Sequence, residues 1–297
     1  MRLLILGASG LTGSRIIELA KEAGYSVVGT YYSSSLASSK EYVKVDIRDE
    51  LPIRKLIRRV KPDVLINVVN VPGIDYCEKY PDDARKILAL SMKYIGEECK
   101  RIGTKIIYTS TDYVFDGASS HLYTENDKVN PINTYGSAKA EGERIVQELD
   151  ISYNIVRPSL IYGDPNKSRF LKWILSSLRE GKEIYPFYDQ FSCPTYVDDL
   201  AKAILILARS DKDGIYHTAG SSCVSRYQYA QTIARIFGYE LDLIKPVSLD
   251  KYTLGARRPK YLCLSTEKFY SDFSFRFKSI EEGLAEIRDI YYGGVRS

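Results

Sequence analysis

A glycine-rich turn near the N-terminus constrains the fold of this 297-residue chain more than any other feature. Four apolar residues at positions 3–6 precede the segment Gly7-Ala-Ser-Gly-Leu-Thr-Gly13, and an amphipathic stretch over residues 12–23 follows it. A strand, a glycine turn and a helix start in this order bring a helix N-terminus to face an anion. The pattern therefore predicts a Rossmann-type βα unit that binds the pyrophosphate of a dinucleotide.

Each glycine of this loop has its own physical reason. Gly7 permits the tight turn, Gly10 lets the backbone approach a pyrophosphate, and Gly13 lets helix and strand pack closely. A simple glycine turn without a ligand is the alternative, but the context of strand and helix favours the phosphate loop. We expect the other residues of the turn to lie beside the cofactor as well: Ser9, Leu11 and Thr12.

Strand-like and helical segments alternate through the first half of the chain. Apolar, β-rich runs predict strands over residues 3–6, 26–31, 42–45, 64–69, 105–109 and 152–157. Helical periodicity occurs between them, over residues 12–23, 50–60, 82–101 and 134–149. This alternation predicts an α/β fold with a Rossmann-type doubly wound parallel sheet covered by helices on both faces.

The pattern changes after Pro158. Loops rich in Pro, Gly and Tyr occur near residues 164–170 and 181–195, and helical stretches cover 169–179, 197–208, 227–237 and 280–290. We expect a smaller C-terminal substrate lobe at the carboxyl ends of the strands, where open α/β sheets bind ligands. The predicted division is residues 1–160 for the dinucleotide-binding domain, with returning segments from the second half, and residues 161–297 mainly for the substrate-binding lobe.

The end of the second predicted strand bears on the choice of cofactor. Enzymes that use NAD usually carry Asp or Glu there to bind the ribose 2′-hydroxyl, but no acid occurs between residues 23 and 40. We therefore expect NADPH, with NADH as the alternative. The candidates to hold its 2′-phosphate, unless they are solvated loop residues, are Arg15, Ser33, Ser34 and Lys40.

A second cofactor contact is expected after the third predicted strand, at Asp46 and Ile47. Asp46 either accepts a hydrogen bond from the adenine amino group or caps the helix that follows.

A tyrosine and a lysine four residues apart, Tyr135 and Lys139, stand at the start of a predicted helix. This spacing places both on one helix face. An ammonium near a phenol lowers the phenol pKa from about 10, so Tyr135 can act as a general acid near neutral pH. Lys139 would also bind the nicotinamide ribose. Thr111, after the strand over residues 105–109, would hold a substrate carbonyl oxygen beside Tyr135.

These motifs resemble the dTDP-4-dehydrorhamnose reductase family of extended short-chain dehydrogenases/reductases. The similar segments are Ser110-Thr-Asp-Tyr-Val-Phe-Asp-Gly117, Pro131-Ile-Asn-Thr-Tyr135-Gly-Ser-Ala-Lys139, Arg157-Pro-Ser-Leu-Ile-Tyr-Gly163 and Ala256-Arg-Arg-Pro259. The resemblance covers nearly the full chain. It implies that Thr111, Tyr135 and Lys139 are catalytic and that Pro158 flanks the nicotinamide. The same branch contains the regulatory subunit of methionine adenosyltransferase.

The resemblance also implies a substrate site. Asp75 matches a family position near cofactor and substrate, and the two arginines of the Ala-Arg-Arg-Pro segment suit a diphosphate, because a guanidinium can bind two phosphate oxygens. The candidate substrate-binding residues, besides Thr111, are Asp75, Arg169, Arg257 and Arg258.

The chain departs from the family pattern in two places. Asn67-Val-Val-Asn70 stands where the family usually has Asn-Ala-Ala, and the predicted helix over residues 84–101 lacks the family's asparagine. Both departures leave the catalytic triad intact and leave the identity of the substrate open.

The sequence thus predicts an NAD(P)-dependent reductase of a 4-keto nucleotide sugar, specifically a dTDP-4-dehydrorhamnose reductase of dTDP-rhamnose biosynthesis. Two alternatives stay open. A non-catalytic, NADP-binding regulatory subunit can retain the same triad. An epimerase or dehydratase of the superfamily would share the fold, although a dehydratase needs a carboxylate pair and Thr111-Asp112-Tyr113 offers one acid.

The composition of the chain limits the kinds of partner that we expect it to bind and the compartment in which we expect it. The 42 Lys and Arg residues nearly balance the 38 Asp and Glu residues, which gives no reason to expect nucleic acid. No apolar run approaches the roughly 20 residues of a membrane helix. We expect a cytoplasmic protein that binds a nucleotide sugar, with a homodimer as an open alternative. Five scattered cysteines and two distant histidines indicate no metal site and no disulfide framework, so reduced thiols are expected.

Overall fold

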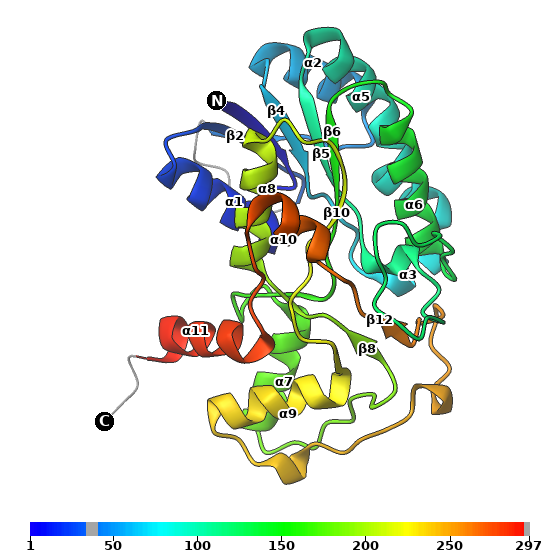
Figure 1. Cartoon of the computed structure of the whole chain (residues 1–297), viewed down its shortest axis with the longest axis vertical. Helices are drawn as coiled ribbons and strands as arrows, with labels where there is room; N and C mark the ends of the chain where they lie inside the picture. The colour runs from blue at the N-terminus through cyan, green and yellow to red at the C-terminus, as the bar shows by residue number, and fades with distance from the viewer. Residues whose placement is uncertain (34–40, 294–297) are drawn as a thin grey trace.

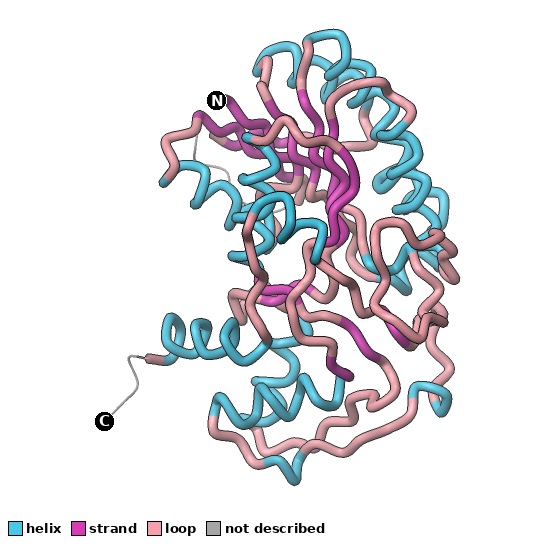
Figure 2. Tube along the Cα trace, in the orientation of Figure 1, coloured by secondary structure: helices cyan, strands magenta, loops and turns pink. Residues whose placement is uncertain are grey.

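A seven-stranded parallel sheet forms the centre of the computed structural model, which describes residues 1–33 and 41–293 (Figures 1 and 2). The strands lie in the order β10-β6-β5-β4-β1-β2-β3, and every pairing is parallel. Their bounds are β1 Arg2–Leu6, β2 Ser26–Tyr31, β3 Tyr42–Lys44, β4 Val64–Asn67, β5 Lys105–Thr109, β6 Tyr153–Arg157 and β10 Gly214–His217. The predicted α/β class is confirmed.

Helices cover both faces of this sheet because its central strands are apolar on both sides. All of residues 3–6 are buried in β1. One face packs against α1 (Leu11–Glu22) and α8 (Val197–Arg209), which also contact each other. The other face packs against α2 (Glu50–Val60), α5 (Ser91–Ile102) and α6 (Thr134–Gln147).

The connection between β4 and β5 is more broken than its helical periodicity predicts. The single helix expected over residues 82–101 is α4 (Pro81–Arg85), a π-helical turn (Lys86–Leu90) and then α5. A separate short helix, α3 (Ile74–Lys79), precedes them. Apolar residues continue along one side of the helix through the π turn. The hydrophobic pattern of the sequence therefore does not reveal the change in hydrogen bonding.

The second half of the chain returns to the large sheet before building the smaller lobe. Strand β10 pairs with β6, and α10 (Glu267–Phe273) packs against β10. Helices α7 (Arg169–Arg179), α9 (Arg226–Phe237) and α11 (Ile280–Tyr292) gather at the opposite end of the molecule from α2 and α5 (Figure 1). Two small sheets accompany them: β11 (Val224–Ser225), β8 (Phe191–Ser192) and β12 (Tyr261–Leu262) form a mixed one, and β7 (Ile161–Tyr162) pairs with β9 (Thr195–Tyr196).

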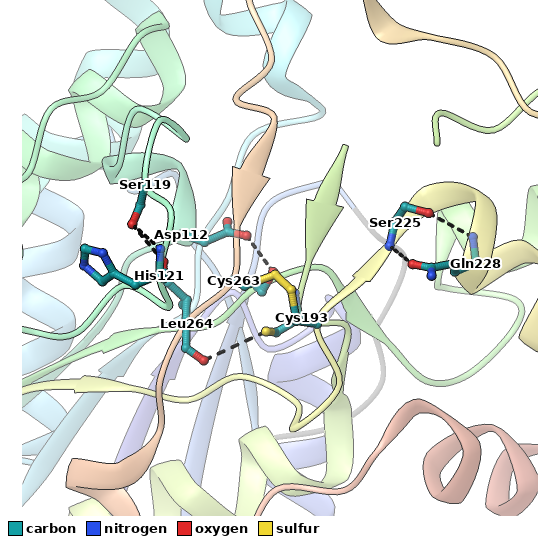
Figure 3. Close-up of a disulfide and its surroundings, with 10 residues drawn as sticks. Asp112, Ser119, His121, Cys193, Ser225, Gln228, Cys263 and Leu264 are labelled. Atoms are coloured by element: carbon teal, nitrogen blue, oxygen red, sulfur yellow. Dashed lines mark hydrogen bonds between the residues drawn. A yellow bond between two sulfur atoms is a disulfide. The ribbon is translucent and has the colours of Figure 1, made fainter. Parts of the chain in front are cut away.

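Two of the five cysteines form a disulfide, so the expectation of reduced thiols is wrong for this pair. Cys223 and Cys263, 40 residues apart, have Cα atoms separated by 5.5 Å. Strands β11 and β12 both pair with β8, which brings the two sulfurs together next to Cys193 (Figure 3). Cys77, Cys99 and Cys193 remain free and buried. Sequence spacing could not reveal the bond, because only the small mixed sheet brings its halves together.

Metal-binding clusters and membrane-spanning helices are both absent from the described residues. No group of three or more His, Cys, Asp or Glu side chains in residues 1–33 and 41–293 is arranged to hold a metal ion. Within the same ranges, every helix is too short or too polar to cross a membrane.

Candidate active site

The glycine loop joins β1 to α1 with the geometry its spacing predicts. Gly7 has a φ of +85°, and its N–H donates to Thr30 Oγ1 at 3.2 Å. A Cβ at Gly13 would lie 2.3 Å from the Gly7 carbonyl oxygen, so α1 can approach the turn only through glycine. A Cβ at Gly10 would meet only that same oxygen, at 3.4 Å. The fold itself thus requires Gly7 and Gly13, but leaves space over Gly10.

The rest of the loop lies at the N-terminus of α1. Gly10 is the N-cap residue of this helix, and no side chain caps it. Ser9, Leu11 and Thr12 are partly exposed around it. The amides of this first helical turn can therefore bind an anion, as predicted for the pyrophosphate.

Arg15 does not lie free for a 2′-phosphate. Its Nε and Nη2 donate to the two carboxylate oxygens of Asp198 at 2.8 and 2.7 Å, and its Nη1 donates to Glu18 at 2.9 Å. The guanidinium thereby ties α1 to α8 on the face of the sheet that both helices cover. Of the other candidates, Ser33 is exposed just beyond β2, and Ser34 and Lys40 lie outside the described residues.

Asp46 and Arg48 form an ion pair near the end of β2. Arg48 donates to Asp46 from its backbone and its side chain, and also to Asp83 at 2.7 Å and to Tyr32 Oη at 3.0 Å. The hydrogen bond from the Arg48 side chain lowers the pKa of Asp46. The capping alternative for Asp46 is wrong, because the N-cap position of α2 belongs to Asp49. Sequence reasoning missed Arg48, whose guanidinium reaches Tyr32 directly after β2.

The three predicted catalytic side chains come together at the carboxyl edge of β5 and the start of α6. Thr111, Tyr135 and Lys139 are all buried, with 6%, 8% and 2% of their surface exposed. Tyr135 Oη accepts a hydrogen bond from Asn70 Nδ2 at 3.3 Å. Burial raises the pKa of Tyr135, while hydrogen bonds with Asn70 and Thr111 lower it.

Lys139 does not act on the Tyr135 hydroxyl in the way the sequence suggested. Its Nζ donates to the Thr109 carbonyl at 2.8 Å and lies 5.2 Å from the centre of the Tyr108 ring. Burial lowers the pKa of Lys139 to about 7. The expectation that a nearby ammonium lowers the Tyr135 pKa is therefore wrong for this structure, since desolvation penalises the charged form of each group.

Asp112 joins Thr111 to the loop after β6. Its Oδ1 accepts from Thr111 Oγ1 at 3.0 Å and its Oδ2 from Ser159 Oγ at 2.6 Å, while its N–H donates to the Pro158 carbonyl at 3.1 Å. Burial raises the pKa of Asp112 to about 6. This network holds Pro158 close to Thr111.

The N-terminus of α6 is fastened from two directions, which positions Tyr135. Asn133 caps the helix by accepting from the Gly136 N–H at 2.8 Å. Glu78 accepts from both the N–H and the hydroxyl of Thr134, at 2.8 and 2.7 Å. Asn133 Nδ2 also donates to the Arg257 carbonyl at 2.9 Å, so the catalytic helix is tied to the double-arginine loop.

The predicted substrate residues fall into two groups. Asp75 accepts from Arg258 Nη2 at 2.7 Å and from the Ala256 N–H at 2.9 Å, so it is already paired with one of the two loop arginines. Arg257 is exposed and lines a surface hollow with Glu78. Arg169 lies on α7 and donates to the Pro72 carbonyl, just before α3, the helix that carries Asp75. The structure therefore brings Asp75, Arg257 and Arg258 together, and Arg169 contacts the segment that leads into Asp75.

The small lobe adds a cation that sequence reasoning missed. Arg226, the first residue of α9, donates to Gln190 Oε1 at 3.4 Å and lies 5.3 Å from the Phe170 ring centre. Its Nη1 is buried without a hydrogen-bond partner. The charge of Arg226 opposes the rise in the pKa of Asp112 that burial causes. No local motif marks Arg226, because its partners Gln190 and Phe170 come from separate segments of the chain.

Known proteins of similar sequence and structure cover nearly the whole chain. A family model described as the RmlD substrate binding domain matches residues 1–292. The spore coat polysaccharide biosynthesis protein SpsK of Bacillus subtilis is 32% identical over 264 residues, which are 89% of this chain and 89% of that protein.

Two solved structures share the fold. A dTDP-4-dehydrorhamnose reductase from Clostridium acetobutylicum aligns with a TM-score of 0.88 at 32% identity, covering 98% of this chain and 99% of its own. A dTDP-4-dehydrorhamnose reductase from Bacillus anthracis, solved in complex with NADP, aligns with a TM-score of 0.87 at 29% identity, covering 96% and 98%.

Proposed function

The chain belongs to the RmlD substrate-binding-domain family, as the sequence resemblance indicated, and we propose that it reduces the keto group of a 4-keto nucleotide sugar. It is an NAD(P)-dependent reductase of that family. The observation that carries the proposal is the pairing of the buried Thr111 and Tyr135 side chains at the sheet edge that also holds the glycine loop.

The residues of the loop fit a dinucleotide. The amides of the first turn of α1 are uncapped by side chains, and the space over Gly10 admits a pyrophosphate. When bound, the reduced nicotinamide supplies a hydride to the substrate carbonyl carbon.

The chain's own residues then handle the oxygen and its proton. Thr111 orients the carbonyl oxygen, and Tyr135 donates its hydroxyl proton to that oxygen as general acid. Lys139 lies one helical turn from Tyr135, where its Nζ can bind the nicotinamide ribose. Asp112 holds the Thr111 hydroxyl in place through their 3.0 Å hydrogen bond.

We propose dTDP-4-dehydrorhamnose as the first substrate to test. Two structural relatives carry that activity in their names, whereas SpsK is named for spore coat polysaccharide biosynthesis. Arg257 and Arg258 suit the diphosphate, and Arg169, beside the segment that leads into Asp75, is a further candidate. The assay follows NADPH absorbance with this ketone and with its UDP counterpart; no turnover of any 4-keto nucleotide sugar would refute the proposal.

NADPH is the proposed cofactor, with Ser33 and Arg48 as the 2′-phosphate contacts. The support is the absence of an acid at the end of β2 and the bond of Arg48 to Tyr32 there. Arg15 is held by Asp198 and Glu18. Arg48 is likewise held by Asp46 and Asp83, and is preferred because it also donates to Tyr32, directly after β2.

We propose the same boundary between the cofactor-binding and substrate-binding parts of the chain as the sequence predicts. We assign cofactor binding to residues 1–160 together with β10 and α8, and substrate binding mainly to residues 161–297. The double-arginine loop belongs to the second part, and reaches the triad through Asn133.

Tyr135→Phe tests the catalytic assignment. Removal of the general acid should lower kcat by about 10²–10⁴-fold and leave the fold and NADPH affinity intact, because only hydrogen bonds at one hydroxyl are lost. Tyr216→Phe is a matched control, as its hydroxyl donates to Asp272 at 2.8 Å, on α10. Near-normal turnover by Tyr135→Phe would contradict the assignment.

A further inference from the structure

Asn70 places its side-chain amide against the hydroxyl of Tyr135. It lies in the loop after β4, at the same carboxyl edge of the sheet as Thr111. Asn70 Nδ2 is 3.3 Å from Tyr135 Oη. Asn70 itself is exposed, whereas Tyr135 is buried. The sequence distinguished Asn70 only as a departure from the family pattern.

A backbone contact determines which way the Asn70 amide points. The Val71 N–H donates to Asn70 Oδ1 at 2.9 Å. Because an N–H group can only donate, the amide oxygen must face Val71, and the amide nitrogen must face Tyr135. Asn70 therefore presents a donor, not an acceptor, to the phenol oxygen.

Tyr135 needs such a donor. Burial raises its pKa, which disfavours the phenolate that remains once the proton has left. Lys139 Nζ is directed to the Thr109 carbonyl. Hydrogen bonding with Asn70 and Thr111 lowers the Tyr135 pKa, and Thr111 is also committed to Asp112.

We propose that Asn70 is a further catalytic residue, whose amide N–H stabilises the Tyr135 phenolate formed during carbonyl reduction. The inference rests on the proposed function. The carbonyl carbon gains a C–H bond from the nicotinamide hydride, the C=O π electrons move to oxygen, and that oxygen takes the proton as the Tyr135 O–H bond breaks. The electron pair left on Tyr135 Oη is the one that Asn70 binds. The ketone is reduced to an alcohol and NADPH is oxidised to NADP⁺.

Two substitutions separate this role from a structural one. Asn70→Ala removes both the donor to Tyr135 and the acceptor for the Val71 N–H. Asn70→Asp keeps an oxygen for Val71 but replaces the donor by a second carboxylate oxygen facing Tyr135. If Asn70 only shaped the loop, Asn70→Asp would behave like the wild type.

The experiment measures kcat and KM for the 4-keto sugar, NADPH affinity by fluorescence, and the pH dependence of the reverse alcohol oxidation. Loss of a hydrogen bond to a charged group raises the free energy of the transition state. Asn70→Ala should therefore lower kcat about tenfold to hundredfold. NADPH affinity and the substrate KM should stay close to wild type. In the oxidation direction, which needs the phenolate, the acidic limb should move up by about one to two pH units. Asn70→Asp should show losses and shifts at least as large.

Each outcome decides the question. Wild-type kcat in Asn70→Asp, or a loss of kcat in both variants without movement of the pH limb, would overturn the catalytic role. An active wild type with two unaffected variants would refute only the inference about Asn70. A wild type inactive on every 4-keto nucleotide sugar would refute the proposed function and, with it, this role.

Discussion

Reduction of the Cys223–Cys263 disulfide should destabilise the small lobe by an amount that the structure allows us to calculate. The bond closes a loop with a sequence separation of 40 residues. Loop-closure entropy for a loop of that length corresponds to about 4 kcal/mol at 25 °C. With an unfolding entropy of about 2 cal/mol/K per residue for this chain, the expected fall in Tm is about 6 °C.

The assay compares thermal unfolding of the oxidised protein, the dithiothreitol-treated protein and a Cys223→Ser variant. Treatment should lower the Tm of the wild type and leave that of Cys223→Ser unchanged, because the variant cannot form the bond. Thiol labelling after denaturation should count three free cysteines before reduction and five after it, as Cys77, Cys99 and Cys193 are free. Five reactive thiols in the untreated protein, or a Tm insensitive to reduction, would refute the reasoning.

Three further predictions concern the loop, the acid dependence of stability and the cofactor. Gly10→Val should fold but lose NADPH binding in a fluorescence titration, whereas Gly13→Val should not fold, because its Cβ would lie 2.3 Å from a backbone oxygen; normal NADPH affinity in folded Gly10→Val would contradict the loop assignment. Ion pairs with arginines lower the pKa of buried Glu98 to about 2, so it stabilises the fold above its unfolded pKa of about 4.3 and loses that effect as pH falls toward 2. The difference in unfolding free energy between wild type and Glu98→Gln, measured by urea denaturation, should therefore shrink as the pH is lowered from about 5. A difference that does not change with pH would contradict this role of Glu98. Arg48→Ala should reduce the kcat/KM preference for NADPH over NADH by about one to two decades, and Arg15→Ala by much less; the reverse order would return the 2′-phosphate contact to Arg15.

Local signals explain most of what was predicted about the fold. The strand and helix bounds come from runs of apolar residues whose period reports burial, and the central strands are buried on both faces as their continuous apolar sequences require. The π-helical turn before α5 was missed, because it changes hydrogen bonding without changing which side of the helix is apolar.

The candidate site was predictable where its residues are close in sequence. Gly7, Gly10 and Gly13 occupy one turn, and Tyr135 and Lys139 one helical face, so spacing alone places them. Asn70, Arg48 and Arg226 were not selected, because each reaches the site from a separate element.

What the sequence determined by itself is therefore the class of the fold, the phosphate loop and the order of the catalytic motifs, all of which depend on neighbours within a few turns of the chain. Only the tertiary structure decided which charges are already paired. Arg15 meets Asp198 across 183 residues, and Cys223 meets Cys263 only because β8 lies between their strands. It also reversed the expected shift of the Tyr135 pKa. The physical reason is that desolvation and long-range pairing depend on packing from every side, which no single stretch of sequence contains.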